Sequence, residues 1–68
     1  MIDPNMMPID ILRMALEREK EAYEFYSEAA RISSHAPSKN TFLEMAAEEK
    51  RHIHQIEEEL DRYFQGDN

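Results

Sequence analysis

The feature that most constrains this chain is that helix-breaking residues occur only at its two ends and in one short internal stretch. The sequence contains one glycine and three prolines. Pro4 and Pro8 precede the first long segment, Gly66 follows the second, and Pro37 lies within "SSHAPS", residues 33–38. The segments between these breaks are rich in Ala, Glu, Leu, Met, Arg and Lys, which are strong helix formers. Period-2 alternation is missing, so the sequence predicts an all-α chain.

We expect one helix over about residues 8–33, a loop over about 34–37 and a second helix over about 38–64. Pro8 and Pro37 suit the first turns of the two helices, and Gly66 suits a position just past a helix C-terminus. Two helices of this length joined by a short loop form an antiparallel hairpin. Residues 1–68 are therefore expected to be a single domain, in which residues 1–7 form a loose arm.

Charge and composition exclude several classes of protein. The net charge of −7 argues against a nucleic-acid surface, which needs clustered Lys and Arg. The chain has no cysteine, so neither a disulfide nor a thiolate metal site is available to it. No stretch approaches the ~20 apolar residues that a membrane helix requires. We expect a soluble cytoplasmic protein with no nucleic-acid or membrane partner.

Each expected helix carries a row of mostly apolar residues at alternating spacings of three and four, and each row contains one glutamate. Such rows are the contact seams of helical bundles. The first row is Ile9, Leu12, Leu16, Glu19, Tyr23, Tyr26, Ala30 and Ser33; the second is Phe42, Ala46, Glu49, Ile53, Ile56, Leu60 and Tyr63, flanked by Met45 and His52.

The positions of the two interrupting glutamates are related to each other. The midpoint between Glu19 and Glu49 is residue 34, inside the expected loop. In an antiparallel hairpin, residues equally far from the turn lie at the same height, so Glu19 and Glu49 should face each other. His52 follows Glu49 by three residues and therefore projects from the same face of its helix. Two carboxylates and an imidazole in one apolar layer are costly unless a cation compensates them.

A metal ion is a better partner for this layer than a basic side chain. The basic residues near that level are expected to point to the sides or outward: Arg18, Lys20, Lys50 and Arg51. One hairpin cannot cover its own apolar face, whereas two hairpins related by a two-fold axis complete a four-helix bundle. That dimer combines two copies of each ligand, which suits two divalent ions. The mixed oxygen and nitrogen donors favour Fe or Mn, although Zn would also bind.

The segments "ALEREKEAYEFYSEAA" and "FLEMAAEEKRHIHQIEEEL" resemble the half-motif of the ferritin-like superfamily of di-iron proteins, including the rubrerythrin-like ones. In that motif a glutamate on one helix is followed by Glu-x-x-His on the next, which here are Glu19 and then Glu49 and His52. The chain is most similar to the small two-helix encapsulated-ferritin type, in which a tyrosine follows the first glutamate by seven residues, as Tyr26 does here. The resemblance covers nearly all of residues 9–64.

The resemblance implies both an assembly and an activity. The hairpin would dimerise into a ferritin-like four-helix bundle, as a homodimer or part of a higher homo-oligomer. A di-metal site between two chains would hold two Fe ions per dimer and act as a ferroxidase, oxidising Fe(II) with O₂ or peroxide. Glu19, Glu49 and His52 would be the metal ligands, and Tyr26 a hydrogen-bond donor to a ligating carboxylate. The encapsulated type also implies an encapsulating shell protein as a partner and a protein nanocompartment as a location.

The residues also admit plainer interpretations. Glu19 and Glu49 become ordinary surface acids if the first and second rows are rotated by one residue. Tyr26 is expected first of all to pack in the core as an aromatic residue. His54 and Glu48 are expected on a solvated face. The alternative function is a metal-free or Zn-bridged helical dimerisation or interaction module, in which the seam acids fix register or pair with a partner's cations. In addition, full rubrerythrins carry a cysteine-ligated iron domain that feeds electrons to the di-iron site, and a chain without cysteine is not expected to reduce peroxide on its own by that route.

Overall fold

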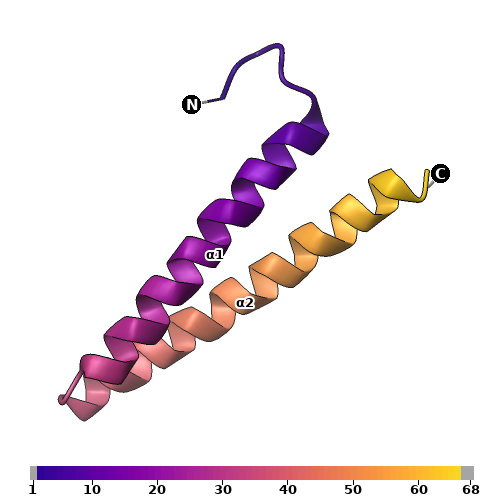
Figure 1. Ribbon diagram of the computed structural model, residues 1–68. Helices are drawn as coiled ribbons and strands as arrows, with labels where there is room; N and C mark the ends of the chain where they lie inside the picture. Colours follow the sequence, from indigo (N-terminus) through magenta and orange to yellow (C-terminus); the bar gives the residue numbers. More distant parts are fainter. Residues whose placement is uncertain (1, 67–68) are drawn as a thin grey trace.

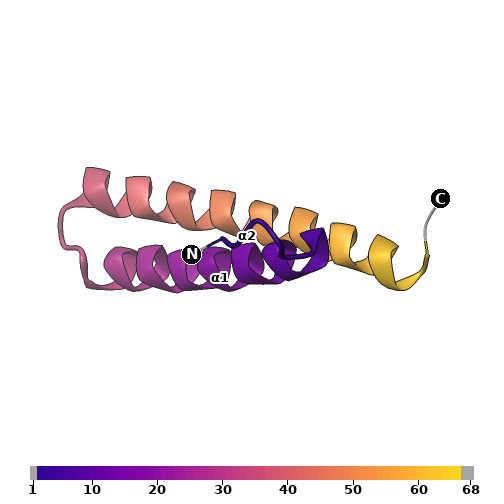
Figure 2. The same ribbon diagram turned by 90° about the horizontal axis from the view of Figure 1, so that it is seen from above.

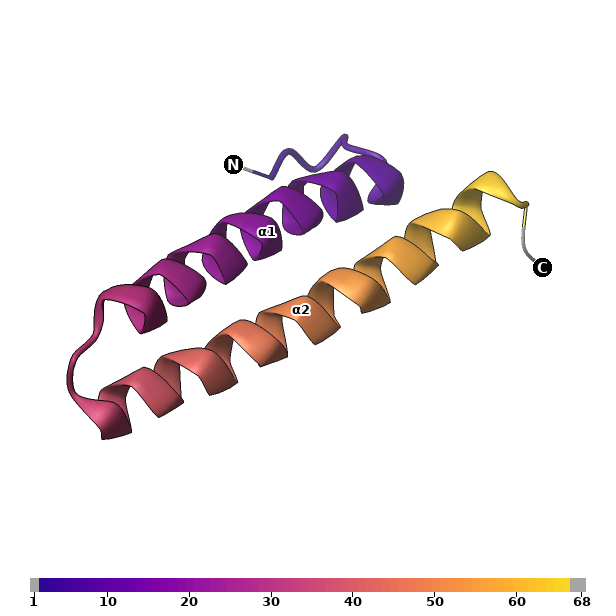
Figure 3. The same cartoon turned by 60° about the horizontal axis from the view of Figure 1, so that its bottom comes forward.

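The computed structural model of the protein describes residues 2–66, which form a hairpin of two α-helices. Helix α1 spans Pro8–Ile32 and helix α2 spans Ala36–Phe64. The two helices run antiparallel and side by side, with the loop at one end and both termini at the other (Figures 1 and 3). The predicted all-α hairpin is thus confirmed over these residues. Met1, Asp67 and Asn68, which the predicted domain included, lie outside the described residues.

The ends of α1 follow from its sequence. Pro8 is its first residue, where the missing N–H costs no helical hydrogen bond, and Asp10 lies in the positively polarised first turn. The helix ends at Ile32, one residue before the predicted end, and the Ser33 N–H donates to the Ala29 carbonyl at 3.1 Å.

Helix α2 begins at Ala36 rather than at about residue 38. The reason is that Pro37 fits within the first helical turn, whose N–H groups have no partner inside the helix. The first helical bond at this end is donated by the Lys39 N–H to the His35 carbonyl at 2.9 Å. At the other end, Gly66 has a φ of +63°, and its N–H donates to the Tyr63 carbonyl at 3.2 Å. A glycine adopts this left-handed conformation without strain, as predicted for a residue just past the helix.

The N-terminal arm is more ordered over residues 2–7 than the predicted loose arm. The Asp3 side chain and main chain close a turn, accepting hydrogen bonds from the Asn5 N–H at 2.8 Å and the Met6 N–H at 3.0 Å. The arm then runs back along the start of α1 (Figure 3). There Ile2 lines a small pocket together with Ile11, Met14, Ala15 and Arg18.

The hairpin is one layer of two helices, since its Cα atoms span 46 × 25 × 12 Å. Its two broad faces are therefore uncovered within one chain, and the buried core of the described residues is small. Three apolar residues are buried in it: Ala30, Ala46 and Leu60. Neither described helix has the length and apolar composition needed to cross a membrane.

The predicted contact rows agree with the observed burial, apart from the far end of α2. Every residue of the first row is at least partly buried, and so is the second row as far as Leu60. Tyr63 is 47% exposed, because the end of α2 projects past the start of α1 (Figure 2). Met45, expected to flank the second row, is 41% exposed and lies outside the core of one chain.

The small core predicts that two leucines of α2 contribute very differently to the stability of the fold. Leu60 is 8% exposed and Leu43 is 50% exposed. We expect Leu60→Ala to lower the free energy of unfolding by about 2 kcal/mol, the low end of the range for buried leucines, because this thin layer can partly collapse around the lost volume. Leu43→Ala should change it by less than about 0.5 kcal/mol. Urea unfolding followed by circular dichroism, at one fixed chain concentration, measures both values; equal losses would contradict the assigned core.

Candidate metal centre

Glu19, Glu49 and His52 meet between the two helices. One ligand atom from each residue can be chosen so that all three lie within 4.8 Å of one another. The His52 Nδ1 atom lies 2.8 Å from Glu19 Oε1 and 2.9 Å from Glu49 Oε1. The three residues that the sequence predicted as ligands are therefore brought together. Metal binding by these three residues stays a prediction.

The hairpin positions these side chains by two simple rules. Glu19 and Glu49 are equally far from residue 34 of the loop 33–35, so the antiparallel helices place them at one height. Glu49 and His52 are three residues apart on α2, which places them on one face of the helix. Both relations depend only on helix geometry and loop position, which is why the sequence could predict them.

The site is partly shielded from water and carries a net negative charge when His52 is neutral. The side chains of Glu19 and Glu49 are 25% and 17% exposed, whereas that of His52 is 41% exposed. The pKa of His52 is raised above 6.5, chiefly by its hydrogen bond to Glu49 and then by that to Glu19, against an opposing effect of burial. Protonated His52 donates from Nδ1 toward both carboxylates, so this proton occupies the position between the three ligand atoms.

The surroundings of the two carboxylates favour a cation. In the described part of the chain, the ion pairs of Glu19 and Glu49 are both with His52. Three of the arginines pair instead with glutamates three residues earlier on exposed faces, in Arg31–Glu28, Arg51–Glu48 and Arg62–Glu59. The set of two carboxylate oxygens and one imidazole nitrogen is therefore available, and it suits divalent Fe, Mn or Zn. The donor set of this chain thus fits a metal ion.

The other residues weighed from the sequence take different places. Tyr26 is half-buried, and its ring packs edge-on against Phe25, with centroids 5.4 Å apart at 76°. The hydrogen bonds of Glu19 and Glu49 within residues 2–66 involve His52, so a bond from the Tyr26 hydroxyl stays a prediction. His54 is exposed, as expected, and pairs with Glu58 across 3.6 Å.

Glu48, which the sequence placed on a solvated face, lies closer to the candidate metal centre than expected. Its carboxylate is 57% exposed, yet Oε1 lies 3.8 Å from His52 Nε2. The same oxygen accepts a hydrogen bond from Arg51 Nε at 3.2 Å. The sequence could have indicated this closeness, because Glu48 and His52 are four residues apart and are therefore neighbours on a helix.

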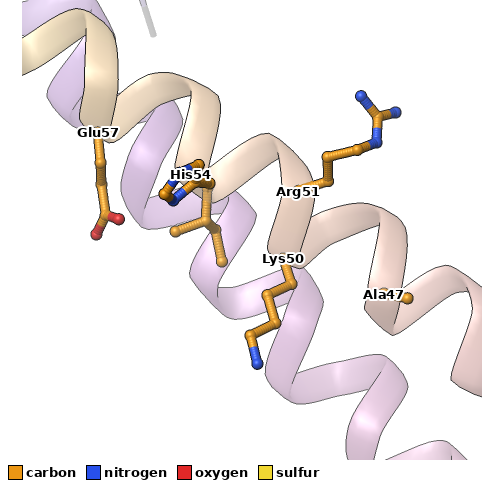
Figure 4. A pocket seen from close by; sticks show the side chains of 6 residues that line it. Ala47, Lys50, Arg51, His54 and Glu57 are labelled. Atoms are coloured by element: carbon orange, nitrogen blue, oxygen red, sulfur yellow. The ribbon is translucent and has the colours of Figure 1, made fainter.

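A surface groove on α2 has a different location from the metal candidates. It is lined by Ala47, Lys50, Arg51, Ile53, His54 and Glu57. Figure 4 shows that Lys50 and Arg51 point in different directions from the helix, so their charges do not converge on one ligand. The groove includes none of Glu19, Glu49 and His52. The groove and the candidate metal centre are therefore separate features of the surface.

Comparison with known proteins gives one match. A protein-family model described as Rubrerythrin matches residues 10–68, which is most of the chain and contains all three predicted ligands. No curated protein and no solved structure shows significant similarity to the chain.

The hydrogen bonds of the site predict the titration of His52. In protein stripped of metal with a chelator, we expect the pKa of His52 to lie above 6.5. A folded-state pKa above the unfolded value means that protonation of His52 stabilises the fold. This contribution is complete below about pH 6.5 and is lost as the pH rises through the higher folded-state pKa. The imidazole Cε1–H chemical shift of His52, followed by NMR against pH, measures the value.

Glu49→Gln tests whether the hydrogen bond to Glu49 is the main cause of the raised pKa of His52. It should lower the pKa of His52 more than Glu19→Gln does, because the hydrogen bond to Glu49 is the largest contribution. Glu57→Gln, on the outer surface of α2, is the control and should leave the pKa unchanged. A pKa that responds equally to all three substitutions would show a general charge effect in place of the two direct bonds.

Proposed function

Because the chain belongs to the rubrerythrin family, we propose that it is an iron-handling protein of the ferroxidase type, which oxidises Fe(II) with O₂ or peroxide. The observation that carries this proposal is the convergence of Glu19, Glu49 and His52, with ligand atoms within 4.8 Å of one another. In these terms Fe(II) is the substrate, and O₂ or peroxide is the electron acceptor.

Each of the three residues has a definite part in binding. The carboxylates of Glu19 and Glu49 offer anionic oxygens that attract and neutralise a divalent ion, and partial burial strengthens that attraction. His52 offers a nitrogen donor through Nδ1, the ring atom that faces both carboxylates. Iron bound there supplies the one-electron redox chemistry, which none of these side chains has. The chain's own contribution is to hold the donors together in a partly dehydrated layer.

The number of donors supports sharing of the site between two chains. One hairpin offers three ligand residues, which is half of what a pair of carboxylate-bridged ions uses in four-helix di-iron bundles. A second copy related by a two-fold axis would bring two more carboxylates and one more imidazole. Four carboxylates then balance two divalent ions in charge. We therefore propose a homodimer as the functional unit, with about one iron per chain.

The face of α2 that carries the ligands also has the character of a contact surface. Its residues follow alternating steps of four and three: Met45, Glu49, His52, Ile56, Glu59 and Tyr63. Both ends of this row, Met45 and Tyr63, are large apolar or aromatic side chains that remain exposed in one chain. A row of this spacing is typical of a helical bundle seam, and its two ends are still exposed in one chain. A second copy seated on it would cover these side chains and complete the ligand set together.

The alternative function, an interaction module without redox activity, has one observation in its favour. Phe25 and Ile32 on α1 are exposed apolar side chains seven residues apart, on one side of the helix. A contact surface alone explains them, whether the dimer is metal-free or Zn-bridged. It does not explain why two carboxylates and an imidazole converge between the helices. Iron oxidation separates the two functions.

The proposed function predicts a stoichiometry and its loss in one variant. Anaerobic titration of chelator-treated protein with Fe(II) should saturate near one iron per chain. Exposure to air should then produce the near-ultraviolet absorbance of Fe(III) faster than in buffer. Glu49→Ala should abolish both tight binding and rapid oxidation, because it removes a carboxylate from the centre of the ligand set.

Glu57→Ala is the matched control, since it removes an acid from the same helix outside the ligand set. It should bind and oxidise iron like the unmodified chain. Saturation by Zn(II) with no oxidation of Fe(II) would instead support the Zn-bridged module. No binding of either metal above the chelator background would leave the metal-free module.

The shared site also predicts where a charge blocks assembly. Met45→Lys places a cation at the end of the ligand-bearing row, whereas Leu43→Lys places it two residues away, off that row. Both positions are exposed in one chain, at 41% and 50%. We expect Met45→Lys to weaken dimerisation in sedimentation equilibrium and Leu43→Lys to leave it unchanged. If both variants dimerise equally well, the two chains do not meet along this row.

A further inference from the structure

The contact rows of the two helices repeat each other at a fixed interval. Each residue of the second row, from Phe42 to Tyr63, follows a residue of the first row by 30 positions, as Glu49 follows Glu19. The antiparallel helices are therefore related by an approximate two-fold axis that passes between these glutamates, perpendicular to the broad faces. Such a rotation exchanges the helices and leaves each broad face on its own side. Residues 30 positions apart thus lie on the same broad face.

This relation places part of α1 on the broad face that carries His52. Ala22 is 30 positions before His52, and Ala15 is 30 positions before Met45. The row of α2 from Met45 to Tyr63 borders this face as well, and we call it the ligand-bearing face. A second copy that adds its ligands beside His52 has to approach the hairpin from this side.

The edge of the ligand-bearing face is largely apolar on α1 and polar on α2. On α1 this edge consists of residues seven positions apart: Ile11, Arg18, Phe25 and Ile32. The residues 30 positions later on α2 are Thr41, Glu48, Gln55 and Arg62. Phe25 and Ile32 are 66% and 67% exposed in one chain. Exposed apolar side chains at a seven-residue spacing are typical of a surface that packs against another helix.

The N-terminal arm supplies an apolar side chain at the point where Arg18 interrupts this edge. Ile2 lies against Ile11, Met14, Ala15 and Arg18, and it is nevertheless 60% exposed. More than half of its surface therefore remains available for a contact outside the chain. With Ile2 in place, the apolar edge continues along the whole length of α1.

Local hydrogen bonds hold the arm in this position. The Asp3 carboxylate accepts a hydrogen bond from the Asn5 N–H at 2.8 Å, and the Asp3 carbonyl accepts one from the Met6 N–H at 3.0 Å. These bonds close a turn, after which the arm and the start of α1 lie side by side (Figure 3). A segment that is ordered before binding loses less conformational entropy when a partner covers it.

We propose that the arm, residues 2–7, is part of the surface that binds a second copy of this chain, with Ile2 as its contact residue. The inference rests on the homodimer of the proposed function and adds a second contact to the ligand-bearing row. The incomplete ligand set on the same face favours a second copy over a different protein. One chain offers three ligand residues there, and a second copy brings the same three again.

Two matched pairs of variants of the full chain test the arm. Ile2→Asp and Asn5→Asp each add one negative charge to the arm, but only Ile2→Asp removes the apolar contact. Asp3→Ala and Asp3→Asn each remove one negative charge, but only Asp3→Ala loses the side-chain acceptor that closes the turn. Sedimentation equilibrium, with and without saturating Zn(II), measures the dimer dissociation constant of each variant. Far-ultraviolet circular dichroism checks that each one is helical.

We expect Ile2→Asp to raise the dimer dissociation constant on the order of 10-fold, because the contact is lost in both copies and a carboxylate is buried in its place. Asp3→Ala should raise it by a smaller factor, on the order of 3-fold, because the arm then has to be ordered on binding. Asn5→Asp and Asp3→Asn should stay within about 2-fold of the unmodified chain.

A second readout reports the contact itself. In a mixture of ¹³C-labelled and unlabelled chains, isotope-filtered NMR should show nuclear Overhauser effects from the Ile2 methyl groups of one copy to protons of the other copy. Asp3→Ala should weaken these signals, and Asp3→Asn should retain them.

The outcomes distinguish this inference from the proposed function. An unchanged dissociation constant in Ile2→Asp would overturn the role of the arm, and a lower one would show that the arm covers the face and has to leave it. Equal weakening in Ile2→Asp and Asn5→Asp would also overturn it and indicate repulsion by charge. Rapid iron oxidation together with any of these results leaves the proposed function intact. A dimer that depends on Ile2 in a chain that binds no iron would support this inference and refute that function. A chain that stays monomeric with and without Zn(II) overturns both this inference and the shared site.

Discussion

The negative charge of two carboxylates in a half-buried layer has to be compensated, and the rest of this structure depends on that constraint. A two-helix hairpin has little apolar burial with which to offset the dehydration of an unpaired acid. Glu19 and Glu49 nevertheless face each other between the helices, where apolar side chains would pack better. His52 compensates part of their charge, and in doing so brings the three donors to within 4.8 Å. The cost of keeping these acids is understandable if a metal ion completes the compensation.

The thin shape of the hairpin and the composition of the site point to one solution. A layer 12 Å thick in Cα atoms leaves both broad faces of the helices uncovered. Met45 and Tyr63 are exposed at the ends of the ligand-bearing row and are uncovered in one chain. The ligand set of one chain also needs further donors to hold two ions. In the proposed homodimer, a second copy would supply both the cover and the donors at the same surface. Burial of apolar area and sharing of the metal would thus be coupled, so that each stabilises the other.

The sequence predicted those features that depend on helix geometry alone. Glu19, Glu49 and His52 follow from a loop centred near residue 34 and from a spacing of three residues, and the structure places them together. The start of α2 at Ala36 was missed because a proline is compatible with more than one position in the first turn. The exposure of Met45 was missed because the row spacing does not say which flank one partner helix covers. The sequence placed Glu48 on a solvated face because an exposed acid on a helix is usually solvated, and its closeness to His52 Nε2 depends on side-chain positions that the sequence does not give.

The arrangement around His52 also bears on how readily the site would take up an ion. Its Nδ1 already points at both carboxylates, and the position between the three donors is held by one proton. Exchange of that proton for a metal ion would change the charge at this point, with the three donors already in reach of one another. Little side-chain entropy then remains to be lost on binding, which is the advantage of a preorganised ligand set. The proton and a metal ion would thus be alternative occupants of one position between the three donors.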